Sequence, residues 1–167
     1  QLAKLLACCV RPMARLMIRW RGCLRHWMVN IARPIKILIA ILGTDQHEVG
    51  ALAISALLRD AGMEVIYSGR FNLPAGVVTS AVQEDVDVIG ISAHSWEYLH
   101  YLDDIFTELT EAGACIPVVV GGSVVTQSDK AGMLAQGIAA AFGPTESASE
   151  IVAEIRRLVM REGEKTR

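Results

Sequence analysis

Aromatic side chains are scarce in this 167-residue chain, and its cysteines follow no recognisable pattern. Aromatic residues make up 5% of the sequence, whereas 52% of residues are hydrophobic and 20% are charged. The four cysteines form no CxxC pair and show no regular spacing, so we interpret them as free thiols in a reducing, cytoplasmic compartment. A mean hydropathy of +0.36 at this length is typical of one small α/β domain whose strands are buried on both faces.

Several common site motifs are also missing. The chain contains no GxxxxGK[ST] and no GxSxG, and no GxGxxG follows the first apolar run. These absences exclude a P-loop nucleotide site, a nucleophile elbow and a dinucleotide fingerprint. Asp45 ends the first apolar segment, but the acidic pair and the later lysine that accompany a phospho-acceptor aspartate are not evident.

Acidic residues are absent from the start of the chain. Residues 1–33 carry seven of the 16 basic side chains, which leaves nine basic and all 18 acidic side chains for residues 34–167. Phosphate binding needs lysine and arginine clustered on the folded surface, so an acidic body argues against nucleic acid as a partner.

We interpret residues 1–33 as a basic N-terminal extension. Pro12 and Gly22 interrupt any long helix there, and no uncharged apolar run is long enough for a membrane span. Four readings stay open: an organelle leader that would direct the protein to the mitochondrial matrix, a partner-docking segment, an interfacial amphipathic helix and a disordered extension.

From residue 34 onward, short apolar runs alternate with segments of helical periodicity. Strands are expected at 35–42, 63–67, 86–92, 117–122 and 138–142, and helices at 49–61, 73–83, 96–112, 129–136 and 146–160. Short right-handed crossovers between parallel strands make an open doubly wound sheet. The sequence therefore predicts a flavodoxin-like fold over residues 34–167, with strand order 2-1-3-4-5.

Polar and glycine-rich segments follow four of the predicted strands. These segments are GTDQHEVG (43–50), SAHS (92–95), GGS (121–123) and GPT (143–145). In open α/β sheets, ligands bind beyond the carboxyl ends of the strands, where the strand order reverses. We therefore expect one ligand site built from these four segments.

The first of these segments combines a histidine with an aspartate two residues earlier. The neutral imidazole of His47 is a good ligand for a transition metal, and the carboxylate of Asp45 can accept the other ring N–H. Gly50 would let a large ligand approach the backbone closely. An alternative stays open at this point: Asp45 caps the next helix and His47 is an ordinary exposed loop residue.

Taken together, the motifs Gly-x-Asp-x-His-x-x-Gly, a serine after the third strand and Gly-Gly after the fourth resemble the cobalamin-binding domain of the methylmalonyl-CoA mutase family. The similarity extends over about residues 33–162 and includes RDAGMEVIYSG, QEDVDVIGIS and FGPT. The resemblance implies that cobalamin binds with its own nucleotide base displaced. His47 would replace that base as the lower cobalt ligand, and Asp45 would hold the imidazole.

The resemblance also implies a path for the nucleotide tail of cobalamin, between the first helix and the sheet. The residues expected along the cofactor site, besides Asp45 and His47, are Gly50, Ser92, His94, Gly121, Gly122, Gly143 and Thr145. One of them departs from the family pattern, which commonly reads Ser-x-Leu where this chain has Ser92-Ala93-His94. His94 puts a polar ring where an apolar side chain is usual.

The family resemblance implies that this is the small, cofactor-binding subunit of an adenosylcobalamin-dependent isomerase. Its partner would be a large TIM-barrel subunit, which would bind the acyl-CoA substrate, of the methylmalonyl-CoA or 2-hydroxyisobutyryl-CoA type. The chain alone would then be inactive, because such a barrel needs about 250 residues. Three alternatives stay open: a corrinoid carrier for methyl transfer, a glutamate-mutase-like small subunit and a non-catalytic cobalamin sensor.

Overall fold

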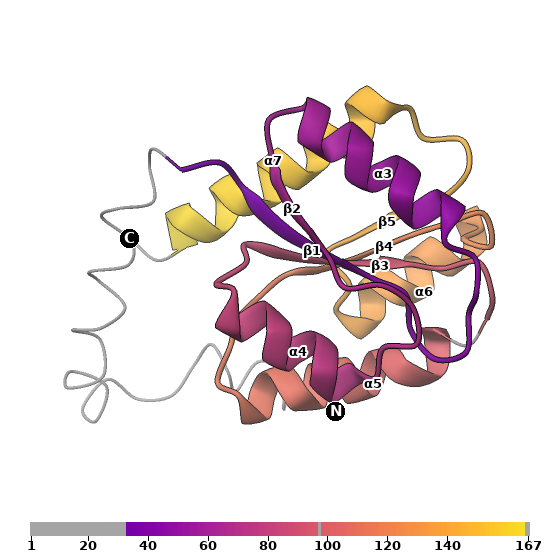
Figure 1. Ribbon diagram of the computed structural model, residues 1–167, viewed down its shortest axis with the longest axis horizontal. Helices are drawn as coiled ribbons and strands as arrows, with labels where there is room; N and C mark the ends of the chain where they lie inside the picture. The colour runs from indigo at the N-terminus through magenta and orange to yellow at the C-terminus, as the bar shows by residue number, and fades with distance from the viewer. Residues whose placement is uncertain (1–32, 97, 166–167) are drawn as a thin grey trace. The chain divides into compact units, whose positions relative to one another are not determined.

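Five parallel strands form one sheet at the centre of the computed structural model, which describes residues 33–96 and 98–165 (Figure 1). The strand order is β2-β1-β3-β4-β5, as the sequence predicts. The strands are β1 (Lys36–Ala40), β2 (Glu64–Tyr67), β3 (Val88–Ser92), β4 (Val118–Gly121) and β5 (Ala140–Phe142). The predicted extension at residues 1–33 lies outside the described residues, except for Arg33.

Helices cover both faces of the sheet. They are α3 (Val49–Asp60), α4 (Pro74–Gln83), α5 (Tyr98–Glu111), α6 (Gln127–Gln136) and α7 (Ala148–Lys165). In Figure 1, α3 and α7 lie on one side of the sheet, and α4, α5 and α6 lie on the other. Among the described residues, no helix is long and apolar enough to cross a membrane.

Each face of the sheet has its own core, because successive side chains of a strand point to opposite faces. Leu38 and Ala40 of β1 belong to the cluster on the α4–α5–α6 side, whereas Ile37 and Ile39 pack on the α3–α7 side. All four side chains are 3% exposed or less. The continuous apolar run of β1 is thus explained by burial on both faces.

The β2 strand is different because it lies at the edge of the sheet. Its side chains are exposed or half-buried, in contrast to the buried residues of β1 and β3.

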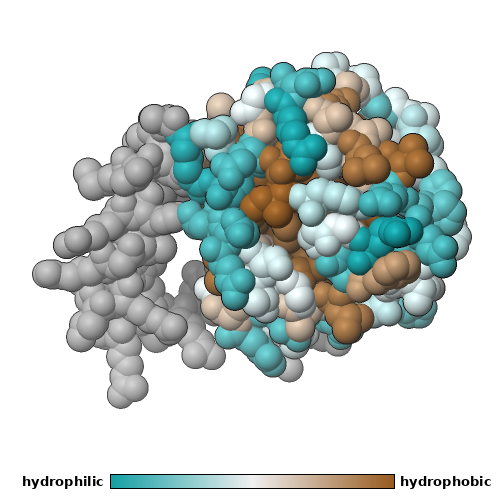
Figure 2. All heavy atoms as spheres, in the orientation of Figure 1, coloured by the Kyte–Doolittle hydropathy of each residue, from teal (hydrophilic) through white to brown (hydrophobic). Residues whose placement is uncertain are grey.

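Figure 2 shows hydrophobic side chains reaching the surface in a band across the middle of this view, among mostly hydrophilic neighbours.

Element boundaries differ from the predicted ones where local hydrogen bonds decide them. Helix α6 starts two residues earlier than expected because Thr126 and Asp129 form a capping box, in which each side chain bonds the other residue's backbone N–H. Helix α7 starts two residues later than expected, where Ser147 and Glu150 exchange the same kind of hydrogen bonds. In both places the capping side chains fix the first turn.

Candidate functional site

The polar segments predicted to form a site do meet, at the carboxyl ends of the strands. Because all strand pairs are parallel, the loops after β1, β3, β4 and β5 leave the sheet in the same direction. The register aligns Ser92 of β3 with Gly121 of β4, and Gly121 in turn with Phe142 of β5. The strand ends therefore bring residues from distant parts of the sequence side by side.

Asp45 joins the loop after β1 to the loop after β3. Its Oδ1 accepts a hydrogen bond from the backbone N–H of His47 at 3.0 Å and lies 2.7 Å from Nδ1 of the His47 ring. Its Oδ2 accepts hydrogen bonds from the backbone N–H groups of His94 and Ser95, at 2.9 and 3.1 Å. The residue is 6% exposed. Both carboxylate oxygens of this buried side chain thus have hydrogen-bond partners.

These contacts determine the charge state of Asp45. Burial raises the pKa of a carboxyl, but the hydrogen bonds from His47, His94 and Ser95 outweigh this effect, so the pKa of Asp45 lies below its ordinary value. The carboxylate is therefore ionised at neutral pH. The alternative in which Asp45 caps the next helix is wrong, because the N-cap of α3 is Glu48 and no side chain caps it.

The His47 ring lies at the surface, at the carboxyl ends of the strands, and has one nitrogen engaged. Its side chain is 61% exposed, and Asp45 occupies its Nδ1. A carboxylate on one ring nitrogen fixes the tautomer and the ring orientation, and it makes the other nitrogen a better donor to a metal. The Nε2 atom of His47 is the nitrogen that this arrangement presents to a ligand.

A second imidazole packs against the first. The ring centroids of His47 and His94 are 4.1 Å apart, and the rings are tilted by 41°. The Nδ1 atom of His94 lies 2.5 Å from the hydroxyl oxygen of Ser123, in the loop after β4. Ser123 belongs to the GGS segment, but the sequence alone gave it no role.

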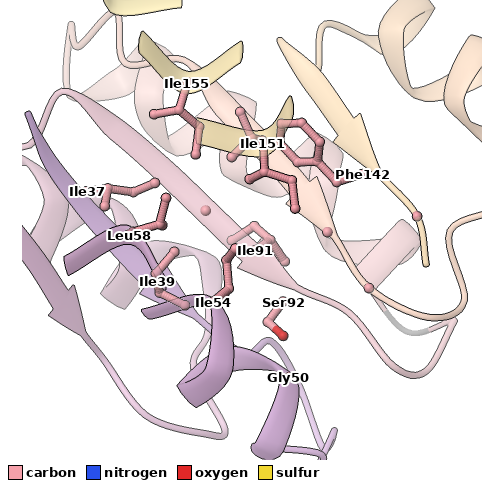
Figure 3. Close-up of a pocket in the computed structure, with 15 residues that line it drawn as sticks. Ile37, Ile39, Gly50, Ile54, Leu58, Ile91, Ser92, Phe142, Ile151 and Ile155 are labelled. Carbon is pink, nitrogen blue, oxygen red and sulfur yellow. The ribbon is translucent and has the colours of Figure 1, made fainter. Parts of the chain in front are cut away.

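A cavity of about 150 Å³ lies between the sheet and the helices α3 and α7 (Figure 3). Its lining residues are Ile37, Ile39, Gly50, Ile54, Leu58, Gly90, Ile91, Ser92, Val119, Gly121, Gly122, Phe142, Gly143, Ile151 and Ile155. Five of the residues predicted for the cofactor site are among them, namely Gly50, Ser92, Gly121, Gly122 and Gly143. The wall is otherwise apolar, so the cavity suits an apolar or aromatic group.

The glycines of the cavity have two different roles. A Cβ atom at Gly50 would lie 3.9 Å from Oγ of Ser92, and one at Gly121 would lie 3.7 Å from Cβ of Phe142, so both positions have room for a methyl group. In contrast, a Cβ at Gly122 would lie 1.6 Å from the carbonyl oxygen of Ala93. Gly122 is therefore required for the close approach of two loops, whereas Gly50 and Gly121 leave space in the cavity.

An ion pair holds the loop after β5. Oε2 of Glu146 accepts a hydrogen bond from the backbone N–H of Gly143 at 2.6 Å, and Oε1 pairs with the ammonium group of Lys130. The contact with Lys130 lowers the pKa of Glu146; burial opposes this, and the bond from Gly143 adds to the lowering. This pair positions Gly143 at the cavity wall, and the sequence analysis missed both of its members.

Four predicted site residues lie outside the cavity wall, namely the Asp45–His47 pair described above, Thr145 and His94. Thr145 is exposed in the turn after β5 and is not among the residues that line the cavity. His94 is also exposed, but it contacts His47 directly. The sequence analysis also missed Ile151 and Ile155, although their spacing of four residues marks the apolar face of the last helix.

The donor set and the cavity fit a metal that is carried by a large organic cofactor. One imidazole with a fixed tautomer can complete the coordination of a metal already held by a macrocycle, as one axial histidine does for haem iron. The adjoining apolar cavity, with open space at Gly50 and Gly121, can take an aromatic appendage of such a cofactor. The residues present therefore fit cobalamin.

The chain is similar to the small subunits of two acyl-CoA mutases. The chain is 39% identical to the 2-hydroxyisobutanoyl-CoA mutase small subunit of Aquincola tertiaricarbonis over 130 residues, which are 78% of this chain and 96% of that protein. It is 39% identical to the pivalyl-CoA mutase small subunit of Xanthobacter autotrophicus over 120 residues, 72% of this chain and 80% of that one.

Solved structures agree on the fold. A cobalamin-binding protein from Desulfitobacterium hafniense superposes with a TM-score of 0.62 at 20% identity, over 75% of this chain and 59% of that chain. The B12 binding domain family matches residues 35–153, which contain the Asp45–His47 pair and every residue of the cavity wall except Ile155. The chain belongs to the B12-binding domain family.

Proposed function

We propose that this chain is the cobalamin-binding small subunit of an adenosylcobalamin-dependent acyl-CoA mutase, and that His47 is the lower axial ligand of the cobalt. The contact of 2.7 Å between Asp45 and Nδ1 of His47 carries the proposal. It holds the imidazole in the tautomer whose Nε2 lone pair can coordinate a metal. The ring lies at the carboxyl ends of the strands, where ligands of this fold class bind.

The cavity supports the second part of the proposed binding mode, which is the placement of the displaced base and the nucleotide tail. When His47 replaces the cofactor's own base on cobalt, that base and its nucleotide tail need a separate place. The cavity beside α3 offers one, because Ile54 and Leu58 provide an apolar wall and Gly50 and Ser92 lie at its polar end. The tail is proposed to lie along Gly50, Ser92, Gly121, Gly122 and Gly143. Thr145 is proposed to contact the cofactor at the rim.

We further propose a large subunit of the TIM-barrel type that binds the acyl-CoA. Two relatives of this chain are described as small subunits of acyl-CoA mutases, a description that implies a second subunit. Adenosylcobalamin supplies radical chemistry when bound, and the protein supplies its orientation. The activity is an isomerisation of a short branched acyl-CoA, such as 2-hydroxyisobutyryl-CoA or methylmalonyl-CoA.

A binding experiment tests this function. The purified full chain is titrated with hydroxocobalamin and with adenosylcobalamin, and binding is followed by equilibrium dialysis and by the visible spectrum. We expect saturable one-to-one binding in the wild type and a loss of at least tenfold in affinity for His47→Ala. The matched control is His100→Ala, which removes an exposed histidine from α5 and leaves binding unchanged.

Two results would contradict the proposal. The first is a wild-type protein that leaves the cobalamin spectrum unchanged at all concentrations. The second is a His47→Ala protein that binds as tightly as the wild type. A mutase assay with a large subunit then tests the activity, and a binding-competent chain that supports no acyl-CoA isomerisation would favour a methyl carrier or a sensor.

A further inference from the structure

We propose that His94 and Ser123 are positioning residues that hold the His47 imidazole in the orientation needed to bind cobalt. This proposal rests on the proposed function of His47 as the lower ligand. It starts from His94, which follows β3 in the segment Ser92-Ala93-His94. The structure places the His94 side chain directly against the proposed ligand.

The contact is one between two rings. With centroids 4.1 Å apart and a tilt of 41°, the His94 imidazole covers one side of the His47 imidazole. The hydrogen bond to Asp45 restrains Nδ1 of the His47 ring but makes no contact with the faces of the ring. A second ring packed against one face further restrains the ring plane. This matters because the His47 side chain is 61% exposed.

His94 is itself held at two points. Its backbone N–H donates to Oδ2 of Asp45 at 2.9 Å, and its Nδ1 lies 2.5 Å from Oγ of Ser123. Asp45 therefore fixes both imidazoles, one through its ring and the other through its backbone. Ser123 adds an anchor from a third loop, the one after β4.

The polar ring has a property that an apolar side chain such as leucine lacks. A leucine at position 94 could pack against His47, but it could not accept or donate a hydrogen bond to Ser123. The contacts His47–His94–Ser123 thus add a side-chain connection between the loops after β1, β3 and β4. A preformed ligand ring avoids the cost of ordering a side chain on binding, which is worth a factor of roughly three to ten in affinity.

Four variants of the full chain test the proposal. Ser123→Ala removes the anchor, and Ser123→Thr keeps a hydroxyl at the same exposed position. His94→Leu replaces the polar ring by an apolar side chain, and His100→Leu is the control at an exposed histidine of α5. For each, the dissociation constant for hydroxocobalamin is measured. The EPR spectrum of cob(II)alamin bound to protein with ¹⁵N-labelled histidines is also recorded. The splitting then distinguishes a protein nitrogen from the cofactor's own base and reports how uniformly the axial ligand is placed.

We expect Ser123→Ala and His94→Leu to bind cobalamin roughly threefold to tenfold more weakly. Their nitrogen splitting should be broadened or mixed with a signal that lacks an axial nitrogen. Ser123→Thr should restore both affinity and line shape, and His100→Leu should match the wild type. Equal thermal unfolding midpoints of the cofactor-free variants would exclude a loss of fold as the cause.

The outcomes separate this inference from the proposed function. If the wild type shows no nitrogen from a protein histidine, the proposed function fails, and with it the role of His94. If the wild type shows that nitrogen but Ser123→Ala and His94→Leu keep wild-type affinity and line shape, only the positioning role is wrong. Tighter binding in His94→Leu would also overturn it.

Discussion

The Oδ2 atom of Asp45 accepts a hydrogen bond from the backbone N–H of His94 at 2.9 Å, although the two residues are 49 positions apart. The other oxygen of the same carboxylate contacts the His47 ring. One side chain therefore joins the proposed metal ligand to the loop that carries its neighbouring ring. A change at Asp45 should consequently affect both the packing of the loops after β1 and β3 and the binding of cobalamin.

We predict that Asp45→Asn lowers cobalamin affinity by about tenfold or more, because the amide no longer offers an anionic acceptor to the His47 ring. The amide nitrogen must also face a backbone N–H group, so the cofactor-free protein should lose about 1–3 kcal/mol of unfolding free energy. Equilibrium dialysis and chemical denaturation measure the two effects. Asp104→Asn, at an exposed site of α5, is the control, and unchanged affinity in Asp45→Asn would leave the carboxylate with a structural role only.

Gly50→Ala should distinguish the contribution of the cavity to cobalamin binding from the contribution of the His47 ligand. The new methyl group would lie 3.9 Å from Oγ of Ser92, so the fold tolerates it, and alanine in α3 should stabilise the protein by up to about 1 kcal/mol. The same methyl narrows the cavity where the nucleotide tail is proposed to lie. Cobalamin affinity should fall, whereas cobinamide, which lacks the tail, should bind as it does to the wild type.

The matched control for Gly50→Ala is Gly76→Ala in α4, where a Cβ meets nothing within 4 Å. This variant should show a similar gain in stability with no change in cobalamin binding. Equal cobalamin affinity in both variants would mean that the tail lies elsewhere.

The two adjacent glycines after β4 should respond differently to alanine. Gly121→Ala has room for its methyl group and should fold normally but bind cobalamin more weakly, because Gly121 lines the cavity. Gly122→Ala would place its Cβ 1.6 Å from the Ala93 carbonyl oxygen, so the loops must separate, at a cost of about 3 kcal/mol or more. Thermal unfolding of the two cofactor-free variants checks this contrast, and equal midpoints would contradict it.

Much of this fold is predictable from the sequence because the signals are local. Continuous apolar runs such as residues 35–42 indicated buried parallel strands, and the order β2-β1-β3-β4-β5 is confirmed. The starts of α6 and α7 differ from the predicted ones, although both capping pairs, Thr126 with Asp129 and Ser147 with Glu150, have the three-residue spacing of a capping box in the sequence.

The site was less predictable because its contacts join distant segments. The sequence pairs Asp45 with His47 through their spacing, but nothing local shows that His94 and Ser95 also donate to Asp45. The packing of His94 on His47 and the ion pair of Lys130 with Glu146 likewise depend on loop geometry. The closure of the cavity by Ile151 and Ile155 requires knowing which helix covers which face of the sheet.

The stability of the loop after β5 should depend on pH through Glu146. Its pKa in the folded protein lies below the ordinary value of 4.5, chiefly because of Lys130. A lowered pKa means that the ionised carboxylate stabilises the fold at pH values above the unfolded pKa, and that this contribution is lost as the pH falls through the folded pKa. Glu146→Gln should therefore be less stable than the wild type by about 1 kcal/mol at pH 7.

The difference between the wild type and Glu146→Gln should shrink below pH 4.5 and disappear in more acidic solution. Chemical denaturation of both proteins across this pH range measures it. A difference that stays constant with pH would show that the carboxylate charge is not the cause.

Ligation of cobalt by His47 can be tested by the EPR spectrum of cob(II)alamin bound to protein whose histidines are labelled with ¹⁵N. A nitrogen from the protein gives a doublet splitting, whereas the cofactor's own ¹⁴N base gives a triplet. Because His94 lies next to His47, the experiment compares His94→Leu with the double variant His47→Ala/His94→Leu. We predict a doublet in the first and none in the second; a triplet in the wild type, or a doublet that survives in the double variant, would contradict ligation by His47.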